Sequence, residues 1–165
     1  MFDFDAKKIS WCQTGLSTNG HFQIKMALPS FVKELASDLK LEELDELMKT
    51  YTNEDGIIFR FLKNFAKFTD IEFIVSHRSA NNPYEEDGIW HDDGSRYLAY
   101  SLSLTTQKVQ GGDFLLRKKG ADNYLTLPTP SFGTFTVFQT GHNGFEHKVT
   151  KVTLGERIIS AGWCS

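Results

Sequence analysis

Cysteine, long apolar runs and excess positive charge are all scarce in this sequence. Its 165 residues include only Cys12 and Cys164, which excludes a disulfide framework and leaves a single bridge open. No stretch is long and apolar enough to predict a transmembrane helix. The net charge of -3 gives no electrostatic reason to expect nucleic acid or an anionic membrane as a partner. Residues 1–5 carry acids where a secretory signal would be basic, so we expect a reduced, cytoplasmic protein.

The composition and the hydrophobic periods predict one folded domain in which helices precede strands. Hydrophobic residues make up 40% and aromatic residues 13% of the chain, as in a globular protein with its own core. Residues 1–20 are weakly patterned, and residues 15–20 resemble a loop. Apolar residues at helical spacing predict helices over residues 30–39, with Ser30 as N-cap, and over 41–48 and 54–68. Their phenylalanines are expected to form core.

Residues alternating with period two predict short strands over most of the remaining chain. These strands cover residues 21–26, 71–77, 89–104, 113–117, 124–127, 133–138, 145–153 and 156–163. Residues 79–88 are turn-forming or charged and predict a loop that could lie over a site. The order of elements favours an α+β fold with a closed or sandwiched β-core on which the helices pack.

One histidine and one carboxylate stand two residues apart, at the beginning of the longest predicted strand. On a strand, side chains i and i+2 project to the same face, so His91 and Asp93 should point together and Asp92 away. His147 begins another alternating run and could supply a third ligand. Two histidines and one carboxylate hold iron(II) on one side and leave the other coordination positions open for chemistry. His21 and His77 are interpreted as structural or surface residues, and His142 as a turn residue.

Arg157 follows His147 by ten residues. If the two strands that carry these residues were antiparallel neighbours, the two side chains could lie across from each other. An arginine lining an apolar barrel offers a planar fork for a carboxylate, and burying its charge unpaired would be costly. An acidic ligand is therefore one partner that fits. The other possibility is an ion pair with Glu146 or Glu156.

Four segments, taken in order, resemble the iron(II)/2-oxoglutarate-dependent dioxygenases, in particular their prolyl-4-hydroxylase-like branch. They are His91-Asp92-Asp93, the strand from Arg96 to Leu104, Gly111-Gly112-Asp113-Phe114, and the block from His147 to Trp163. The histidine and aspartate alone form a weak pattern, but the four segments in this order form a strong one. The resemblance spans residues 71–165.

The resemblance implies a fold, a set of cofactors and a role for each residue. The fold would be a double-stranded β-helix, or cupin-like jelly roll. Residues 1–165 would form one oxygenase domain, with residues 1–70 as mainly helical support and residues 71–165 as the core. His91, Asp93 and His147 would bind Fe(II). Arg157 would bind 2-oxoglutarate, and O2 would complete the reaction, which hydroxylates a protein prolyl residue or a small molecule and releases succinate and CO2.

The sequence departs from the family at the position where many relatives carry a tyrosine that helps to hold 2-oxoglutarate. Ser103 stands there, and Tyr84 from the preceding loop is the other residue that could take this role. Arg96, Tyr97 and Trp90 are expected either to contact substrate or to be ordinary rim residues.

Two other functions stay open from the sequence, and a third is set aside. One is a cupin-like metal enzyme that does not use 2-oxoglutarate, and another is a non-catalytic jelly-roll binding domain. The adjacent His91 and Asp92 also occur in metal phosphohydrolases, but those sites lie on helices and this segment has period two. The primary substrate and the oligomeric state cannot be read from the sequence.

Overall fold

The computed structural model describes residues 4–142 and 144–165, which fold into four helices and ten strands. In chain order they are α1 (Ala6–Asn19), β1 (His21–Lys25), α2 (Ser30–Ser37), α3 (Leu41–Thr52), α4 (Ile57–Leu62), β2 (Ile71–Ser79), β3 (Leu98–Ser103), β4 (Gln110–Gly111), β5 (Phe114–Lys118), β6 (Leu125–Leu127), β7 (Thr134–Gln139), β8 (Phe145–Val149), β9 (Val152–Leu154) and β10 (Glu156–Cys164). The signal-peptide prediction rests partly on residues 1–3, and the turn at 141–144 includes residue 143. Both therefore extend outside the described residues.

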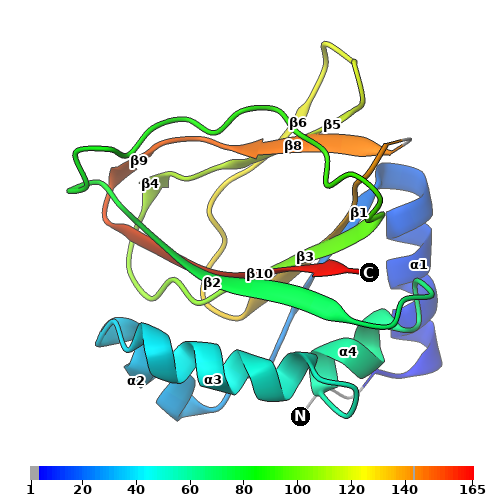
Figure 1. The fold of residues 1–165 in the computed structure, drawn as a ribbon, viewed down its shortest axis with the longest axis horizontal. Helices are drawn as coiled ribbons and strands as arrows, with labels where there is room; N and C mark the ends of the chain where they lie inside the picture. The colour runs from blue at the N-terminus through cyan, green and yellow to red at the C-terminus, as the bar shows by residue number, and fades with distance from the viewer. Residues whose placement is uncertain (1–3, 143) are drawn as a thin grey trace.

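The strands form one large sheet and two small ones, and every pairing is antiparallel. The large sheet has the order β1-β7-β3-β10-β2, and the small sheets are β6-β5-β8 and β4-β9. Figure 1 shows the small sheets on one side of the large sheet, and α2, α3 and α4 beneath its other side. The expected combination of helices with an antiparallel β-core is thus present. The helical N-terminal part is not separate from that core, because β1 forms an edge of the large sheet.

Alternate residues of β3 supply two apolar cores. Leu98, Tyr100 and Leu102 join the helices in a core that contains Ile58 and Phe61, as predicted for the phenylalanine-rich helical face. Ala99 points the other way, into a smaller core between the sheets with Phe114, Leu116 and Phe138. Each large apolar side chain removed from water contributes about 1.5–3 kcal/mol. The central strand is therefore held from both faces.

The loop predicted over residues 15–20 was wrong, because α1 occupies Ala6–Asn19. Its ends carry local signals that outweigh the weak apolar pattern. The Asp5 carboxylate accepts a hydrogen bond from the Lys8 N–H at 2.7 Å, which caps the first turn. Gly20 has a φ of 76° and ends the helix in the left-handed conformation.

Three further predictions differ from the structure. Ser30 is the first residue of α2 rather than its cap, since Pro29 takes the cap position and no side chain caps the helix. The helix predicted over 54–68 is limited to α4 (Ile57–Leu62). The strand predicted over 145–153 is divided into β8 and β9, which pair with different strands. Among the described residues, no helix combines the length and apolar character needed to cross a bilayer.

Candidate metal centre

A two-residue bridge brings His91 next to His147, which lies 56 positions later in the chain. The His91 N–H donates to the His147 carbonyl at 3.1 Å, and the His147 N–H donates to the His91 carbonyl at 2.9 Å. Residues directly opposite on antiparallel strands place their side chains on the same face. The two imidazole rings accordingly lie with their centroids 4.3 Å apart.

Asp93 reaches the histidines from a turn and not from a strand. The strand predicted from residue 89 begins only at Leu98, so the argument from strand alternation was wrong for this pair. Gly94 has a φ of 65°, and its N–H donates to the Asp92 carboxylate at 2.9 Å. The Asp93 N–H donates to the Thr140 hydroxyl at 3.2 Å, which ties the turn to the end of β7. The turn therefore directs the Asp93 carboxylate toward His91 and His147.

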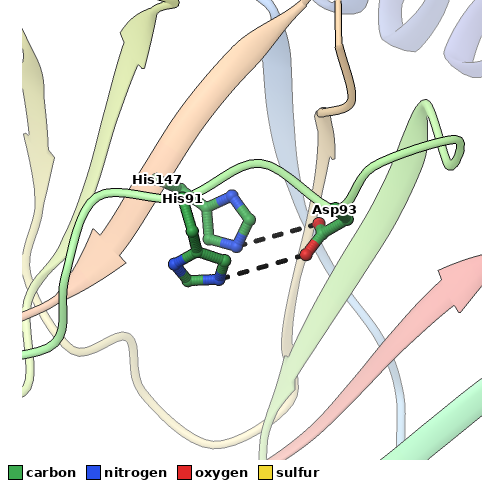
Figure 2. Close-up of side chains that lie close together, drawn as sticks. All are labelled: His91, Asp93 and His147. Carbon is green, nitrogen blue, oxygen red and sulfur yellow. Dashed lines mark ion pairs between the residues drawn. The ribbon is translucent and has the colours of Figure 1, made fainter.

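The three side chains converge on one point, as Figure 2 shows. The Nε2 atom of His91 lies 4.0 Å from Oδ1 of Asp93, and Nε2 of His147 lies 3.8 Å from Oδ2 of Asp93. One ligand atom from each residue can be chosen so that all three lie within 4.8 Å of one another. Asp92 instead accepts a hydrogen bond from Lys119 at 2.5 Å, which holds the pKa of its carboxyl below the ordinary value. The structure thus separates the two adjacent aspartates.

The charge of Asp93 is not balanced by hydrogen bonds. Its side chain is only 7% exposed, and its Oδ2 atom has no hydrogen-bond partner among the described residues. Burial lowers the pKa of His147 to about 4, against the opposing effect of Asp93, so the imidazole is neutral near pH 7. A neutral imidazole is the form that binds metals, and a buried carboxylate without partners favours a cation. The donor set therefore fits a divalent metal ion.

A cavity of about 180 Å³ extends from the histidines between the large and the small sheets. It is lined by Ile74, Ser76, Arg78, His91, Tyr100, Ser101, Phe114, Phe138, His147, Val149, Arg157, Ile159, Ala161 and Trp163. Most of this wall is apolar, and its charged side chains are two arginines. A pocket with apolar walls and a few convergent polar groups is typical of a small-molecule site.

Arg157 is buried in this cavity without a charged partner. It is 3% exposed, and no carboxylate of the described residues forms an ion pair with it. The partners suggested by the sequence are engaged elsewhere: Glu146 pairs with Arg117, and Glu156 lies 3.7 Å from His77. Burial lowers the pKa of Arg157 to about 10. The guanidinium is thus available to an anionic ligand.

Arg157 and His147 do not lie on the neighbouring strands that their spacing suggested. β8 pairs with β5, whereas β10 pairs with β2 and β3, so the two residues are not on neighbouring strands. They lie on different sheets and line the same cavity. The Gly-Gly motif has a direct role here, because a Cβ on Gly112 would lie 2.6 Å from Cδ of Arg157. The absence of a side chain at Gly112 leaves room for the arginine stem.

The two residues predicted to assist Arg157 have other positions. Ser103 is fully buried, and its hydroxyl donates to the Pro130 carbonyl at 2.7 Å. Tyr84 is 87% exposed and is not among the residues that line the cavity. The position of Tyr84 gives its predicted role no support, and the only proton of the Ser103 hydroxyl is already donated.

The three residues predicted to contact substrate all have intramolecular partners. Arg96 pairs with Glu72, and the Tyr97 hydroxyl donates to the Lys67 carbonyl. The ring of Trp90 lies 4.1 Å from the guanidinium carbon of Arg117 and contacts Tyr124 and Lys148. None of the three lines the cavity. Their predicted role in substrate binding stays a prediction.

Sequence reasoning missed Arg78, the second arginine of the cavity. Arg78 lies on β2 directly opposite Arg157 on β10. It pairs at 2.6 Å with Glu85, a buried carboxylate in the loop between β2 and His91. The signal in the sequence was an arginine directly after the strand predicted over residues 71–77, but nothing local indicated that β2 would include it or which strand would be its neighbour.

Comparison with known proteins gives one curated relative and many solved structures of the same fold. A PKHD-type hydroxylase of Prochlorococcus marinus (strain MIT 9515) is 25% identical over 146 residues, covering 84% of this chain and 63% of the relative. A prolyl-4-hydroxylase of Pseudomonas putida has a TM-score of 0.66 at 18% identity, over 94% of this chain and 93% of that one. A prolyl hydroxylase of Trichoplax adhaerens was solved with a peptide fragment of hypoxia inducible factor. It has a TM-score of 0.66 at 12% identity, over 96% of this chain and 89% of that one.

The resemblance to the iron(II)/2-oxoglutarate-dependent dioxygenases is confirmed. The prolyl-4-hydroxylase-like branch is the part of that superfamily that the comparisons support. No protein-family model matches the chain. The chain spans 63% of the length of the curated relative.

Proposed function

We propose that this chain is a single double-stranded β-helix domain with iron(II)- and 2-oxoglutarate-dependent oxygenase activity. The observation that carries this proposal is the convergence of His91, Asp93 and His147, with ligand atoms within 4.8 Å of one another. The unpartnered oxygen of Asp93 and the unpaired guanidinium of Arg157 lie in or beside one cavity. A metal ion would balance the negative charge of Asp93, and a carboxylate would balance the positive charge of Arg157.

Each residue has a distinct role in this proposal. Asp93 and the two histidines would hold Fe(II), and Arg157 would orient 2-oxoglutarate by binding its distal carboxylate. When bound, the iron and 2-oxoglutarate supply the activation of O2 that is coupled to release of succinate and CO2. The apolar wall, which includes Phe114 and Phe138, excludes water from the two ligands.

The substrate proposed is a protein prolyl residue or a small molecule. The names of two structural neighbours favour proline, since both are prolyl hydroxylases and one was solved with a peptide. The curated relative is a hydroxylase. Ile74 and Trp163 form part of the apolar wall, and Ile74 is 49% exposed, so an apolar substrate group could contact it from solvent. Arg96, Tyr97 and Trp90 would contact substrate only after leaving their present partners.

The test is an anaerobic titration of the purified chain with Fe(II) and then 2-oxoglutarate. Wild type should bind Fe(II) and develop the metal-to-ligand charge-transfer band when 2-oxoglutarate is added. Asp93→Ala should bind Fe(II) at least about 100-fold more weakly, because a ligand is lost. The matched control, Asp122→Ala, removes an exposed carboxylate and should behave as wild type.

Two outcomes would contradict the proposal. One is a wild-type chain that binds no Fe(II), which would point to a non-catalytic binding domain. The other is an iron complex with no response to 2-oxoglutarate, which would point to a cupin-like metal enzyme. Turnover gives a further check. If the proposal holds, Arg157→Ala should abolish succinate formation. If the chain is a metal enzyme that does not use 2-oxoglutarate, the same variant should keep its activity.

A further inference from the structure

Two arginines face each other where β2 and β10 pair, and both line the cavity. Arg78 and Arg157 are directly opposite in the antiparallel register. Directly opposite residues project to the same face of a sheet, and like charges in such a pair are destabilising. Both side chains nevertheless reach the same cavity of about 180 Å³. The arrangement needs a compensating negative charge.

Glu85 supplies part of that charge and fixes the position of Arg78. Its Oε1 atom lies 2.6 Å from Nη2 of Arg78 and accepts a hydrogen bond from the Val152 N–H at 3.0 Å. Nη2 of Arg78 also donates to the Glu86 carbonyl at 2.6 Å. Both contacts use the same nitrogen of Arg78. Since a guanidinium carries five N–H donors, Nε and Nη1 keep donors that no described residue accepts.

The charges at this end of the cavity are incomplete without a ligand. One buried carboxylate, Glu85, stands beside two guanidinium groups. The charge of Arg78 lowers the pKa of Arg157, and the charge of Glu85 raises this pKa by a smaller amount. Asp113 also raises the pKa of Arg157, but by less than Glu85. One additional carboxylate between the two arginines would restore the balance.

We propose that Arg78, held in place by Glu85, is a second residue that binds the distal carboxylate of 2-oxoglutarate, together with Arg157. This inference rests on the proposed function and adds a binding residue to it. A carboxylate has two oxygens and needs donors, which Arg78 can provide. Ser103 already donates its only proton to Pro130, and Tyr84 lies on the surface. Arg78 thus takes the supporting role for which those two residues were considered.

The experiment compares two 2-oxoacids that differ only at their distal end. The intact chain, loaded with Fe(II) under anaerobic conditions, is titrated with 2-oxoglutarate and with 2-oxopentanoate, which has a methyl group in place of the distal carboxylate. Arg78→Gln should raise the dissociation constant for 2-oxoglutarate about 10- to 100-fold, as expected for a lost charge-assisted hydrogen bond. Its affinity for 2-oxopentanoate and for Fe(II) should not change.

Two further variants guard against misfolding and nonspecific effects. Arg78→Lys keeps the ion pair with Glu85 but removes the planar fork, so it should weaken 2-oxoglutarate binding by a smaller factor. Arg60→Gln makes the same substitution at an exposed arginine on α4 and should bind both acids as wild type does.

The inference about Arg78 and the proposed function fail in different ways. Unchanged 2-oxoglutarate affinity in both Arg78 variants would overturn the role of Arg78 and leave the oxygenase proposal intact. Equal weakening of both 2-oxoacids would also overturn it, because that result indicates a purely structural residue. A wild-type chain that binds neither acid would refute the proposed function itself.

Discussion

Replacing Arg157 by methionine should stabilise the ligand-free protein while abolishing the binding of 2-oxoglutarate. Methionine keeps an unbranched apolar stem of similar length, so it can occupy the space beside Gly112 and Val152 that the arginine stem fills. It removes a guanidinium that is 3% exposed and has no ion pair among the described residues. The substitution therefore separates the stability of the fold from the requirements of the ligand.

The size of the effect follows from the pKa of Arg157. Burial and the neighbouring Arg78 lower it from 12.5 to about 10. One pKa unit corresponds to about 1.4 kcal/mol, so holding the charge in the cavity costs about 3 kcal/mol. Replacing even a buried ion pair by apolar groups of similar volume is often neutral or stabilising, by up to about 4 kcal/mol. We expect a net gain of roughly 1–3 kcal/mol, since the new side chain will not pack perfectly.

The assay is urea unfolding of the metal-free protein, followed by the same measurement with Fe(II) and 2-oxoglutarate under anaerobic conditions. In the first, Arg157→Met should have the higher midpoint, and its Tm should rise by roughly 2–4 °C per kcal/mol. In the second, ligand at about 100 times its dissociation constant should stabilise wild type by about 2.7 kcal/mol. The variant should gain only what Fe(II) alone provides. Arg60→Met, at an exposed site, should match wild type in both.

One result would refute this reasoning. If Arg157→Met lowered the unfolding free energy of the metal-free protein by 1 kcal/mol or more, given an unchanged m value, the guanidinium would already be satisfied inside the cavity. Arg157 would then be a structural residue, and its selection as the 2-oxoglutarate ligand would lose its physical basis.

The remaining predictions concern the surroundings of the site and the pH dependence of the fold. Glu85→Ala should lower the unfolding free energy by about 3 kcal/mol, because Arg78 loses its partner; urea unfolding beside the exposed control Glu86→Ala measures this. Gly112→Ala should destabilise by about 2 kcal/mol and weaken 2-oxoglutarate binding, because φ is 66° and the new Cβ would contact Arg157; no loss in a thermal scan would contradict this. Burial raises the pKa of the Cys164 thiol from 9.0 to about 12, so the native state keeps this proton while the unfolded chain releases it. The resulting stability should be fully present below pH 9 and be lost as the pH rises toward 12, by about 2 kcal/mol near pH 10.5; urea midpoints for Cys164→Ala should show a weaker alkaline decline.

Local sequence patterns were reliable where burial on one face sets the period. The strand predicted over 71–77 became β2 (Ile71–Ser79), and the one over 156–163 became β10 (Glu156–Cys164). In β2, Ile71, Phe73 and Val75 pack on the apolar core while Ile74 is exposed, and this burial of one face fixes the alternation. β10 is marked instead by consecutive residues that are buried from both sides. The patterns failed where capping decides, as in α1, whose Asp5 cap and Gly20 end outweigh weak periodicity.

The pairing of strands could not be derived from local patterns. The spacing of residues 147 and 157 was compatible with adjacent antiparallel strands, but β8 and β10 belong to different sheets. Likewise, the convergence of His91 and Asp93 was predicted from strand alternation, whereas a bridge to His147 and the turn at Gly94 produce it. These residues were grouped because the order of the segments resembles a family, which carries information that local periodicity lacks.

By itself, the sequence determined which side chains are candidates for the chemistry: two histidines, a carboxylate and an arginine, in an order that resembles one superfamily. Only the tertiary structure decided how they meet, since antiparallel pairing joins residues far apart in the chain. It also decided that Arg78 opposes Arg157 and that Glu85 lies beside it. The physical reason is that burial and charge balance depend on neighbours across the sheet, and the identity of those neighbours is a property of the fold.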